Sequence, residues 1–181
     1  MGKPLELPFD PIDRAAQIWE RRFGASPSMA AVTSIMRAQQ ILLGELDALL
    51  RPYGLTFARY EALVLLTFSR RGALPLGVIG ERLMVHPTSV TNIVSRLERQ
   101  QMVVRRPNPS DGRGRLAEIT DAGRELVESA TGALNKADFA LAGIDAQTAV
   151  EITALLRVIR LTGGDFDAAA HDPWTSSLDA N

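Results

Sequence analysis

The segment from Leu76 to Thr120 constrains the fold of this chain more than any other. It reads as a short apolar helix, a turn before Pro87, a second helix, and two strand-like runs around a tip rich in glycine and arginine. Proline is favoured at the first position of a helix, which places the start of the second helix at Pro87. Two helices joined by a tight turn form the helix-turn-helix pattern, and a hairpin directly after it is a wing.

The second helix of this segment has two chemically different faces. Val90, Ile93, Val94 and Leu97 recur at helical spacing and predict a narrow apolar face. Short polar residues are poor helix formers, so their presence opposite favours contact with a partner over ordinary surface exposure. The residues predicted to contact base edges or phosphates are Pro87, Thr88, Ser89, Thr91, Asn92, Ser95, Arg96 and Arg99.

The hairpin is predicted from strands over residues 102–106 and 115–119, with a tip formed by the turn-rich sequence PNPSDGRG between them. Asp111 and Arg113 can interact and hold this tip in shape. Arg113 is predicted to enter the narrow minor groove of DNA beside the second helix, with Asp111 and Arg115 as further contact residues. The alternative is a simple mobile turn.

Basic charge is concentrated in the same segment. From residue 82 to 115, seven arginines stand against two acidic residues, a net charge of +5, although the whole chain carries −1. Arginine offers a planar fork to phosphates and guanine edges. A solvated surface is normally mixed in sign, so this pattern favours an anionic partner.

Amphipathic helices are predicted on both sides of this segment. Cap and proline signals start helices at residues 11–23 and 27–51, and further caps predict helices over 121–142 and 146–163. Their apolar positions exceed what a winged domain needs to cover itself, so we expect them to form a dimer interface. Glu61 belongs to a further helix that precedes the segment, and Trp174 lies in a tail without periodicity.

The expected fold is mainly α with a small β-hairpin wing, a winged helix-turn-helix with N- and C-terminal dimerisation helices. We divide it into an N-terminal arm, extra helix and first dimerisation helix (1–52), a winged helix-turn-helix DNA-binding domain (53–120), C-terminal dimerisation helices (121–163) and a flexible tail (164–181).

Composition excludes several other classes of protein. No apolar run approaches the ~20 residues that span a bilayer, so a cytoplasmic protein without a membrane partner is expected. The chain has no cysteine, and its histidines, His86 and His171, belong to no nucleophile or metal-binding pattern. We therefore expect no enzyme, no catalytic residues, no metal and no cofactor. A winged-helix module that binds an acidic protein partner is the main alternative.

The run from residue 55 to 126 resembles the MarR family of bacterial winged helix-turn-helix regulators. Its most specific part is a wing signature of fixed spacing, which falls on Asp111, Arg113, Ala117, Ile119, Thr120 and Gly123. The resemblance implies a homodimer that reads a palindromic DNA operator and regulates transcription as a repressor released by a small-molecule effector.

The helix over 11–23 is extra relative to the minimal family and resembles that of the urate-responsive-type branch. By this resemblance, Trp19, Glu61, Arg96 and Arg106 would shape a site for a phenolic, purine or carboxylate anion, with Glu61 where the branch more often has Asp. The alternative is that Trp19 packs into the core and the arginines contact phosphates, which leaves a regulator without a small-molecule ligand.

Overall fold

The structure is a computed structural model that describes residues 6–109 and 111–170, with the side chains of 111–113 excepted. The chain forms two compact units, Met1–Leu141 and Ala142–Asn181. Trp174 and the rest of the predicted tail from 171 onward lie outside the described residues. Among the described helices, none has the length and apolar character needed to cross a membrane.

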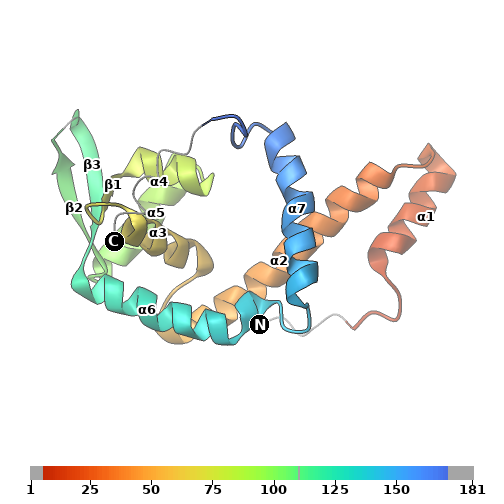
Figure 1. The fold of residues 1–181 in the computed structure, drawn as a ribbon, viewed down its shortest axis with the longest axis horizontal. Helices are drawn as coiled ribbons and strands as arrows, with labels where there is room; N and C mark the ends of the chain where they lie inside the picture. Colours follow the sequence, from red (N-terminus) through yellow and green to blue (C-terminus); the bar gives the residue numbers. More distant parts are fainter. Residues whose placement is uncertain (1–5, 110, 171–181) are drawn as a thin grey trace. The chain divides into compact units, whose positions relative to one another are not determined.

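Two helices open the first unit, and the predicted caps start both of them. α1 spans Pro11–Phe23 and α2 spans Pro27–Leu50, and the side chains of Asp10 and Ser26 accept backbone N–H groups of their first turns. Gly24 ends α1 with a φ of +89°, a conformation that glycine adopts without strain. The two helices lie side by side (Figure 1).

The suggestion that Trp19 packs into the core is wrong for this unit. Within the described residues, α1 has no buried side chain, and Trp19 is 40% exposed. Its ring instead lies against Phe23, with the two ring centroids 4.9 Å apart. The apolar side of α1 is therefore open in the single chain.

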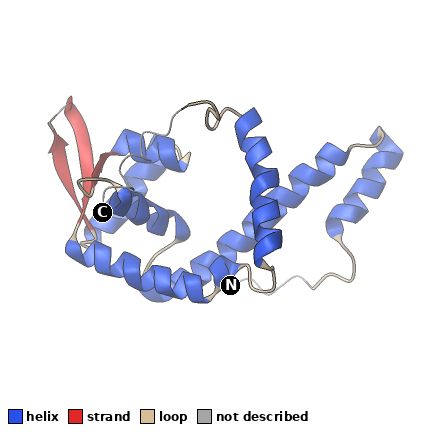
Figure 2. Cartoon of the chain, viewed as in Figure 1, coloured by secondary structure: helices blue, strands red, loops and turns tan. Residues whose placement is uncertain are grey.

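The middle of the first unit is the predicted winged helix-turn-helix. Its three strands, red in Figure 2, form an antiparallel sheet in the order β1-β3-β2. The elements are α3 (Phe57–Phe68), β1 (Ala73–Pro75), α4 (Leu76–Leu83), α5 (Pro87–Arg99), β2 (Val103–Asn108) and β3 (Asp111–Ile119).

The prediction that PNPSDGRG forms the hairpin tip is wrong for most of that sequence. β2 continues through Pro107 and Asn108, and β3 already begins at Asp111. Pro107 can be accommodated because β2 is an edge strand, where a missing N–H leaves no ladder bond unmade. The register shifts between Pro107 and Asn108, so the ladder is irregular directly after the proline.

The start of α3 is capped by a residue of another helix. Thr56 precedes the helix but makes no side-chain cap hydrogen bond. The backbone N–H of Phe57 instead donates to Asp47 Oδ1 at 2.7 Å. Asp47 belongs to α2, and the short 3-10 helix η1 (Arg51–Tyr53) joins the two helices. The end of α2 thus fixes the beginning of α3.

The predicted helix over 121–142 ends early. α6 spans Asp121–Lys136 and is followed by the 3-10 turn η2 (Asp138–Ala140), whose residues all have positive φ. Left-handed backbone cannot continue a right-handed helix, so the chain turns at this point. The predicted cap is confirmed, since Thr120 Oγ1 accepts the N–H of Gly123 at 3.1 Å.

The second unit contains α7 (Ala146–Thr162), which starts at the predicted cap. Asp145 accepts the N–H of Thr148 at 2.7 Å, and this hydrogen bond lowers the pKa of the Asp145 carboxyl. After the helix, Phe166 lies under the guanidinium of Arg157, 4.8 Å from the ring centroid. The first residues beyond α7 therefore fold back onto the helix itself.

A single core holds the first unit together. Fully buried side chains from α2, α3, α5, the sheet and α6 meet in it, with Leu50, Leu63, Leu97, Val103 and Leu134 at most 1% exposed. Val127 and Leu134 belong to α6, in a region that was predicted to form the dimer interface, but they contribute to this core instead. Their burial ties α6 to the winged domain.

Candidate nucleic-acid interface

A tight turn brings α5 close against α4. Met84 ends α4 in the left-handed region with a φ of +52°, and Val85 N donates to Gly80 O at 3.0 Å. A Cβ on Gly80 would lie 3.0 Å from Val90 Cγ2, so only glycine allows α5 this close an approach without displacing Val90. The turn predicted at Val85 and His86 is confirmed.

His86 and Pro87 set the first turn of α5. His86 Nδ1 accepts the N–H of Thr88 at 3.2 Å, and Pro87 occupies the first helical position as predicted. His86 therefore has a structural role as a helix cap.

The two predicted faces of α5 are confirmed. Val90, Val94 and Leu97 are at most 2% exposed and pack into the core, with Ile93 half-buried beside them. The side chains that face solvent are those of Pro87, Thr88, Ser89, Thr91, Asn92, Arg96 and Arg99. A continuous polar surface along an exposed helix is the form that a groove-reading helix takes.

Ser95 differs from the other residues predicted on this face. It is half-buried, and its hydroxyl accepts a hydrogen bond from Arg105 Nη2 at 2.5 Å. The Thr91 hydroxyl is also engaged, because it donates to Pro87 O within the helix at 3.1 Å. Ser95 is therefore occupied within the chain, whereas Thr91 stays exposed.

Positive charge is exposed on α5 and on the wing. Arg96, Arg99 and Arg115 are exposed and form no ion pair with any described residue. Partial burial, with a further contribution from the charge of Arg96, lowers the pKa of the Arg59 guanidinium, while Asp47 acts in the opposite direction. The two guanidiniums are thus close enough to reinforce a positive potential.

Two other arginines of the basic segment are paired. Arg105 Nε lies 3.5 Å from Glu98 Oε2, and Arg106 Nε donates to Glu118 Oε2 at 2.9 Å. Sequence reasoning gave neither partner for these arginines. Residues 105 and 106 point to opposite faces of β2, and strand alternation is the signal that could have separated them.

The structure shows what some residues of the predicted wing signature do in the fold. The backbone of Asp111 and Arg113 lies in β3, but their side chains, and so their predicted interaction, lie outside the described residues. Thr120 caps α6, and Gly123 stands where a Cβ would lie 2.3 Å from Met102 O. The last two positions of the signature therefore have structural tasks at the junction of the wing and α6.

The four residues predicted to shape an anion site are on four elements. Trp19 is in α1, Glu61 in α3, Arg96 in α5 and Arg106 in β2, and no hydrogen bond or ion pair between described side chains joins any two of them. Burial raises the pKa of the half-buried Glu61 carboxyl. Glu61 therefore holds a proton more readily than an exposed glutamate does.

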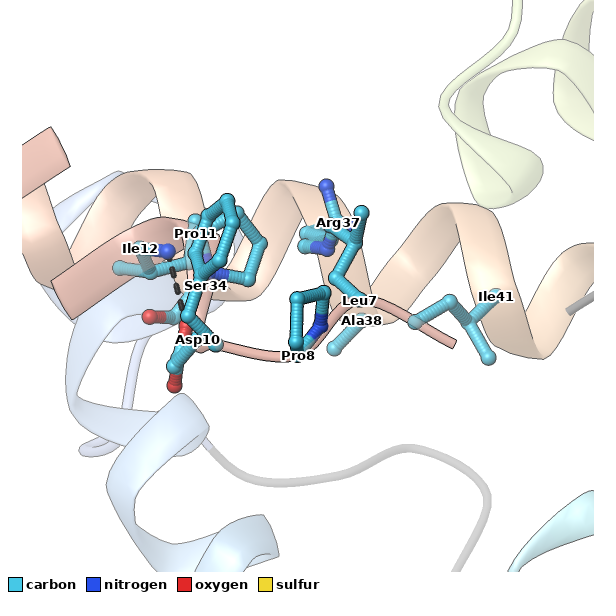
Figure 3. Close-up of a pocket in the computed structure, with 10 residues that line it drawn as sticks. Leu7, Pro8, Asp10, Pro11, Ile12, Ser34, Arg37, Ala38 and Ile41 are labelled. Carbon is cyan, nitrogen blue, oxygen red and sulfur yellow. Dashed lines mark hydrogen bonds between the residues drawn. The ribbon is translucent and has the colours of Figure 1, made fainter. Parts of the chain in front are cut away.

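The described part of the chain has an open groove elsewhere, between the N-terminal arm and α2 (Figure 3). Its volume is about 710 Å³, and its lining includes Leu7, Pro8, Ser34, Arg37 and Ile41. None of the four predicted ligand residues lines it. A second groove of about 480 Å³, lined by residues of α4 and the start of α5, is mostly apolar.

The sheet, the helix-turn-helix and the exposed polar face of α5 define a winged helix-turn-helix protein. A family model described as MarR family matches residues 53–114. The chain is also similar to Sco5413, a MarR family transcriptional regulator from Streptomyces coelicolor, with 65% identity and a TM-score of 0.75 over 79% of this chain and 99% of that one. The chain belongs to the MarR family.

Two further solved structures are similar to this chain. Sco3205, a MarR family regulator from Streptomyces coelicolor in complex with DNA, is 25% identical with a TM-score of 0.66, over 80% of this chain and 91% of that one. CouR from Rhodococcus jostii RHA1, bound to p-coumaroyl-CoA, is 26% identical with a TM-score of 0.60, over 69% and 87%. The first curated relatives are HTH-type transcriptional regulators, and the chain spans only 46% to 63% of their length.

Proposed function

We propose that this chain is a DNA-binding transcriptional regulator that acts as a homodimer and represses genes by occupying a palindromic operator. One observation carries the proposal. The polar and arginine-bearing face of α5 is exposed, and the opposite face of α5 packs on the same hydrophobic core as the three-stranded sheet of the wing. The family membership and the DNA complex of Sco3205 support the same conclusion. We refer to α5 below as the recognition helix.

The recognition helix would read the major groove with its N-terminal half. Thr88, Ser89 and Asn92 are exposed there and can donate to or accept from base edges. Arg96 and Arg99 follow on the next turns, where phosphates lie nearest to such a helix. The wing, with Arg113 and Arg115 in β3, would then reach the adjacent minor groove.

Exposed apolar side chains support the proposed homodimer. In α2, Val32, Met36 and Ile41 are each more than half exposed, and in the second unit Leu155 and Val158 of α7 are 70% and 62% exposed. Apolar surface of this extent on a single chain is typical of an interface with a further copy. Pairing would place two recognition helices about one turn of DNA apart, on the order of 34 Å.

A small-molecule effector is the second part of the proposal. CouR, which is similar to this chain, is bound to p-coumaroyl-CoA, and Glu61 offers a half-buried carboxyl with a raised pKa. We propose that a phenolic, purine or carboxylate anion binds and favours a form of the dimer with low affinity for the operator. Such a ligand acts only through its different affinities for the two forms.

Selection of duplexes from random DNA tests the first part. We expect enrichment of a palindrome and a dissociation constant for it that rises steeply with salt. Arg96, Arg99 and Arg115, the exposed arginines of α5 and the described part of the wing without an ion pair to described residues, amount to six per dimer. Neutralising about six phosphates weakens binding roughly 10³-fold between 50 and 200 mM salt. No enriched sequence, or binding insensitive to salt, would rule out the proposal.

Two more measurements separate the remaining alternatives. Replacing Asn92 with Ala should weaken operator binding if the chain reads DNA, but leave it unchanged if the basic face serves an acidic protein. Calorimetry with phenolic acids and purines, followed by competition against the bound operator, tests the effector. Absence of both heat and release would leave a regulator without a small-molecule ligand.

A further inference from the structure

We infer that Arg105 is the positioning residue that fixes the recognition helix against the wing and thereby determines how well operator DNA is distinguished from other DNA. The inference rests on the proposed function. Arg105 lies in β2, outside the set of residues predicted to contact DNA, and its role follows from what its guanidinium touches.

Arg105 contacts the recognition helix at three places along one side. Its Nη2 donates to Thr91 O at 3.3 Å and to Ser95 Oγ at 2.5 Å, and its Nε lies 3.5 Å from Glu98 Oε2. Residues four and three apart lie above one another on a helix, so these contacts follow a single face. The contacted residues lie within the eight positions from 91 to 98, about two turns of the helix.

The neighbouring arginine provides the contrast within the same strand. The Arg105 side chain is 29% exposed and faces the helix, whereas that of Arg106 is 60% exposed and pairs across the strands with Glu118. Only a guanidinium has donors spread over a rigid plane, so it can serve several acceptors at once. The ammonium of a lysine at 105 is a single point of charge and could reach only one of the three acceptors at a time.

Stability alone is a poor explanation for this arrangement. The Nε–H of Arg105 is buried and has no hydrogen-bond acceptor among the described residues, since Glu98 is close enough for an ion pair only. A buried polar group without its hydrogen bond costs free energy, and an apolar side chain of similar volume would avoid that cost. The feature that such a side chain could not supply is the orientation of the helix.

Orientation matters because two of the contacted residues directly precede residues of the proposed reading face. Thr91 and Ser95 lie one residue away from Asn92 and Arg96, which are exposed on the proposed reading face. Base-edge hydrogen bonds depend on position, whereas attraction to phosphates tolerates small shifts. Loosening the helix should therefore reduce discrimination more than it reduces general affinity for DNA.

The test compares two variants of Arg105. Arg105→Met keeps an unbranched apolar side chain without the guanidinium, and Arg105→Lys keeps the positive charge. Arg106→Met is the matched control in the same strand. Each variant is titrated with the selected operator and with a scrambled duplex of equal length, at several salt concentrations. We expect Arg105→Met to lower the ratio of the two affinities on the order of tenfold, with an unchanged salt slope. Arg105→Lys should retain part of the ratio, and Arg106→Met nearly all of it.

Amide hydrogen exchange provides a readout that does not depend on DNA. Exchange over residues 91–98 should be faster in Arg105→Met than in the wild type or Arg106→Met, while the melting temperatures stay close. If Arg105→Met does not fold, Arg105→Lys carries the same comparison with a smaller effect. Equal exchange in all folded variants would overturn the inference.

The remaining outcomes also decide the question. An unchanged affinity ratio in Arg105→Met overturns the inference, as does an equal weakening on both duplexes with a salt slope smaller by about one, which would make Arg105 a phosphate contact. If the wild-type chain binds neither duplex, the proposed function fails and the discrimination role fails with it. The exchange comparison would still decide whether Arg105 holds the helix to β2.

Discussion

Gly123 is the position where one added methyl group should disturb the fold most. In its place a Cβ would lie 2.3 Å from Met102 O and 2.8 Å from Ile119 Cγ1. Contacts between carbon and carbonyl oxygen are normally ~3.3–3.6 Å, so something must move by about 1 Å. Met102 O cannot move freely, because it accepts the N–H of Thr120 at 3.0 Å, and Thr120 Oγ1 in turn donates to Gln101 O at 2.8 Å.

The expected magnitude follows from two opposing terms. Overpacking a close-packed site costs about 1–3 kcal/mol, and a clash with backbone on this scale belongs at the upper end. Alanine regains about 1 kcal/mol because it is a better helix former than glycine. Gly123→Ala should therefore lower the free energy of unfolding by about 2 kcal/mol and the melting temperature by roughly 4–8 °C.

Gly132 provides the matched control, since it lies in the same helix. A Cβ there has no atom within 4 Å, and the position is exposed. Only the helix-propensity term remains, so Gly132→Ala should raise the free energy of unfolding by up to about 1 kcal/mol. The same substitution in one helix is thus expected to have opposite signs at its two glycines.

Urea denaturation followed by circular dichroism measures both variants. Protein concentration is held fixed across samples, because a dimer's midpoint depends on it. The reasoning is refuted if Gly123→Ala is as stable as the wild type, or if both variants shift in the same direction by a similar amount. Either result would mean that the junction of β2 and α6 adjusts at little cost.

Three further substitutions test separate contacts. Tyr60→Phe removes the 2.8 Å hydrogen bond between the Tyr60 hydroxyl and Thr131 Oγ1, and should cost about 1 kcal/mol by urea denaturation; a neutral result would show that the bond adds nothing. Asp47→Ala leaves the N–H of Phe57 uncapped and should cost about 0.5–2 kcal/mol, which an unchanged midpoint would contradict. Glu61 has a pKa raised by burial, so its effect on stability is favourable below the ordinary glutamate pKa and is lost as pH rises through the raised value. Glu61→Gln should therefore melt higher than the wild type at neutral pH and show no advantage in acid, and a gain that persists at low pH would argue against titration as its cause.

Local signals in the sequence predicted the starts of the helices well. Asp10, Ser26, Thr120 and Asp145 each accept a backbone N–H of the first turn that follows them. A cap hydrogen bond joins residues two or three apart, so the information needed to predict it lies in one short stretch. The apolar face of α5 was predictable for the same reason, because 3.6-residue periodicity is a local property.

The features that sequence reasoning missed depend on distant partners. The cap of α3 comes from Asp47, ten residues away on another helix, so the residues next to the start of α3 do not reveal it. The length of the wing strands depends on β2 lying at the sheet edge, which allows Pro107 in the ladder. The exposure of Trp19 depends on what covers α1, which its amphipathic pattern cannot specify.

Five arginines of the basic segment fall into two groups that a charge count cannot separate. Arg105 and Arg106 are held by Glu98 and Glu118, while Arg96, Arg99 and Arg115 are exposed without an ion pair to described residues. Salt-dependent affinity comes from guanidiniums that release counterions from phosphates, and a guanidinium already paired with a carboxylate has less charge to contribute. The net charge of +5 therefore overstates the electrostatic attraction for DNA, and part of the arginine content serves geometry. On this reasoning, substitution of an unpaired arginine changes how tightly DNA is bound, and substitution of Arg105 changes which DNA is bound.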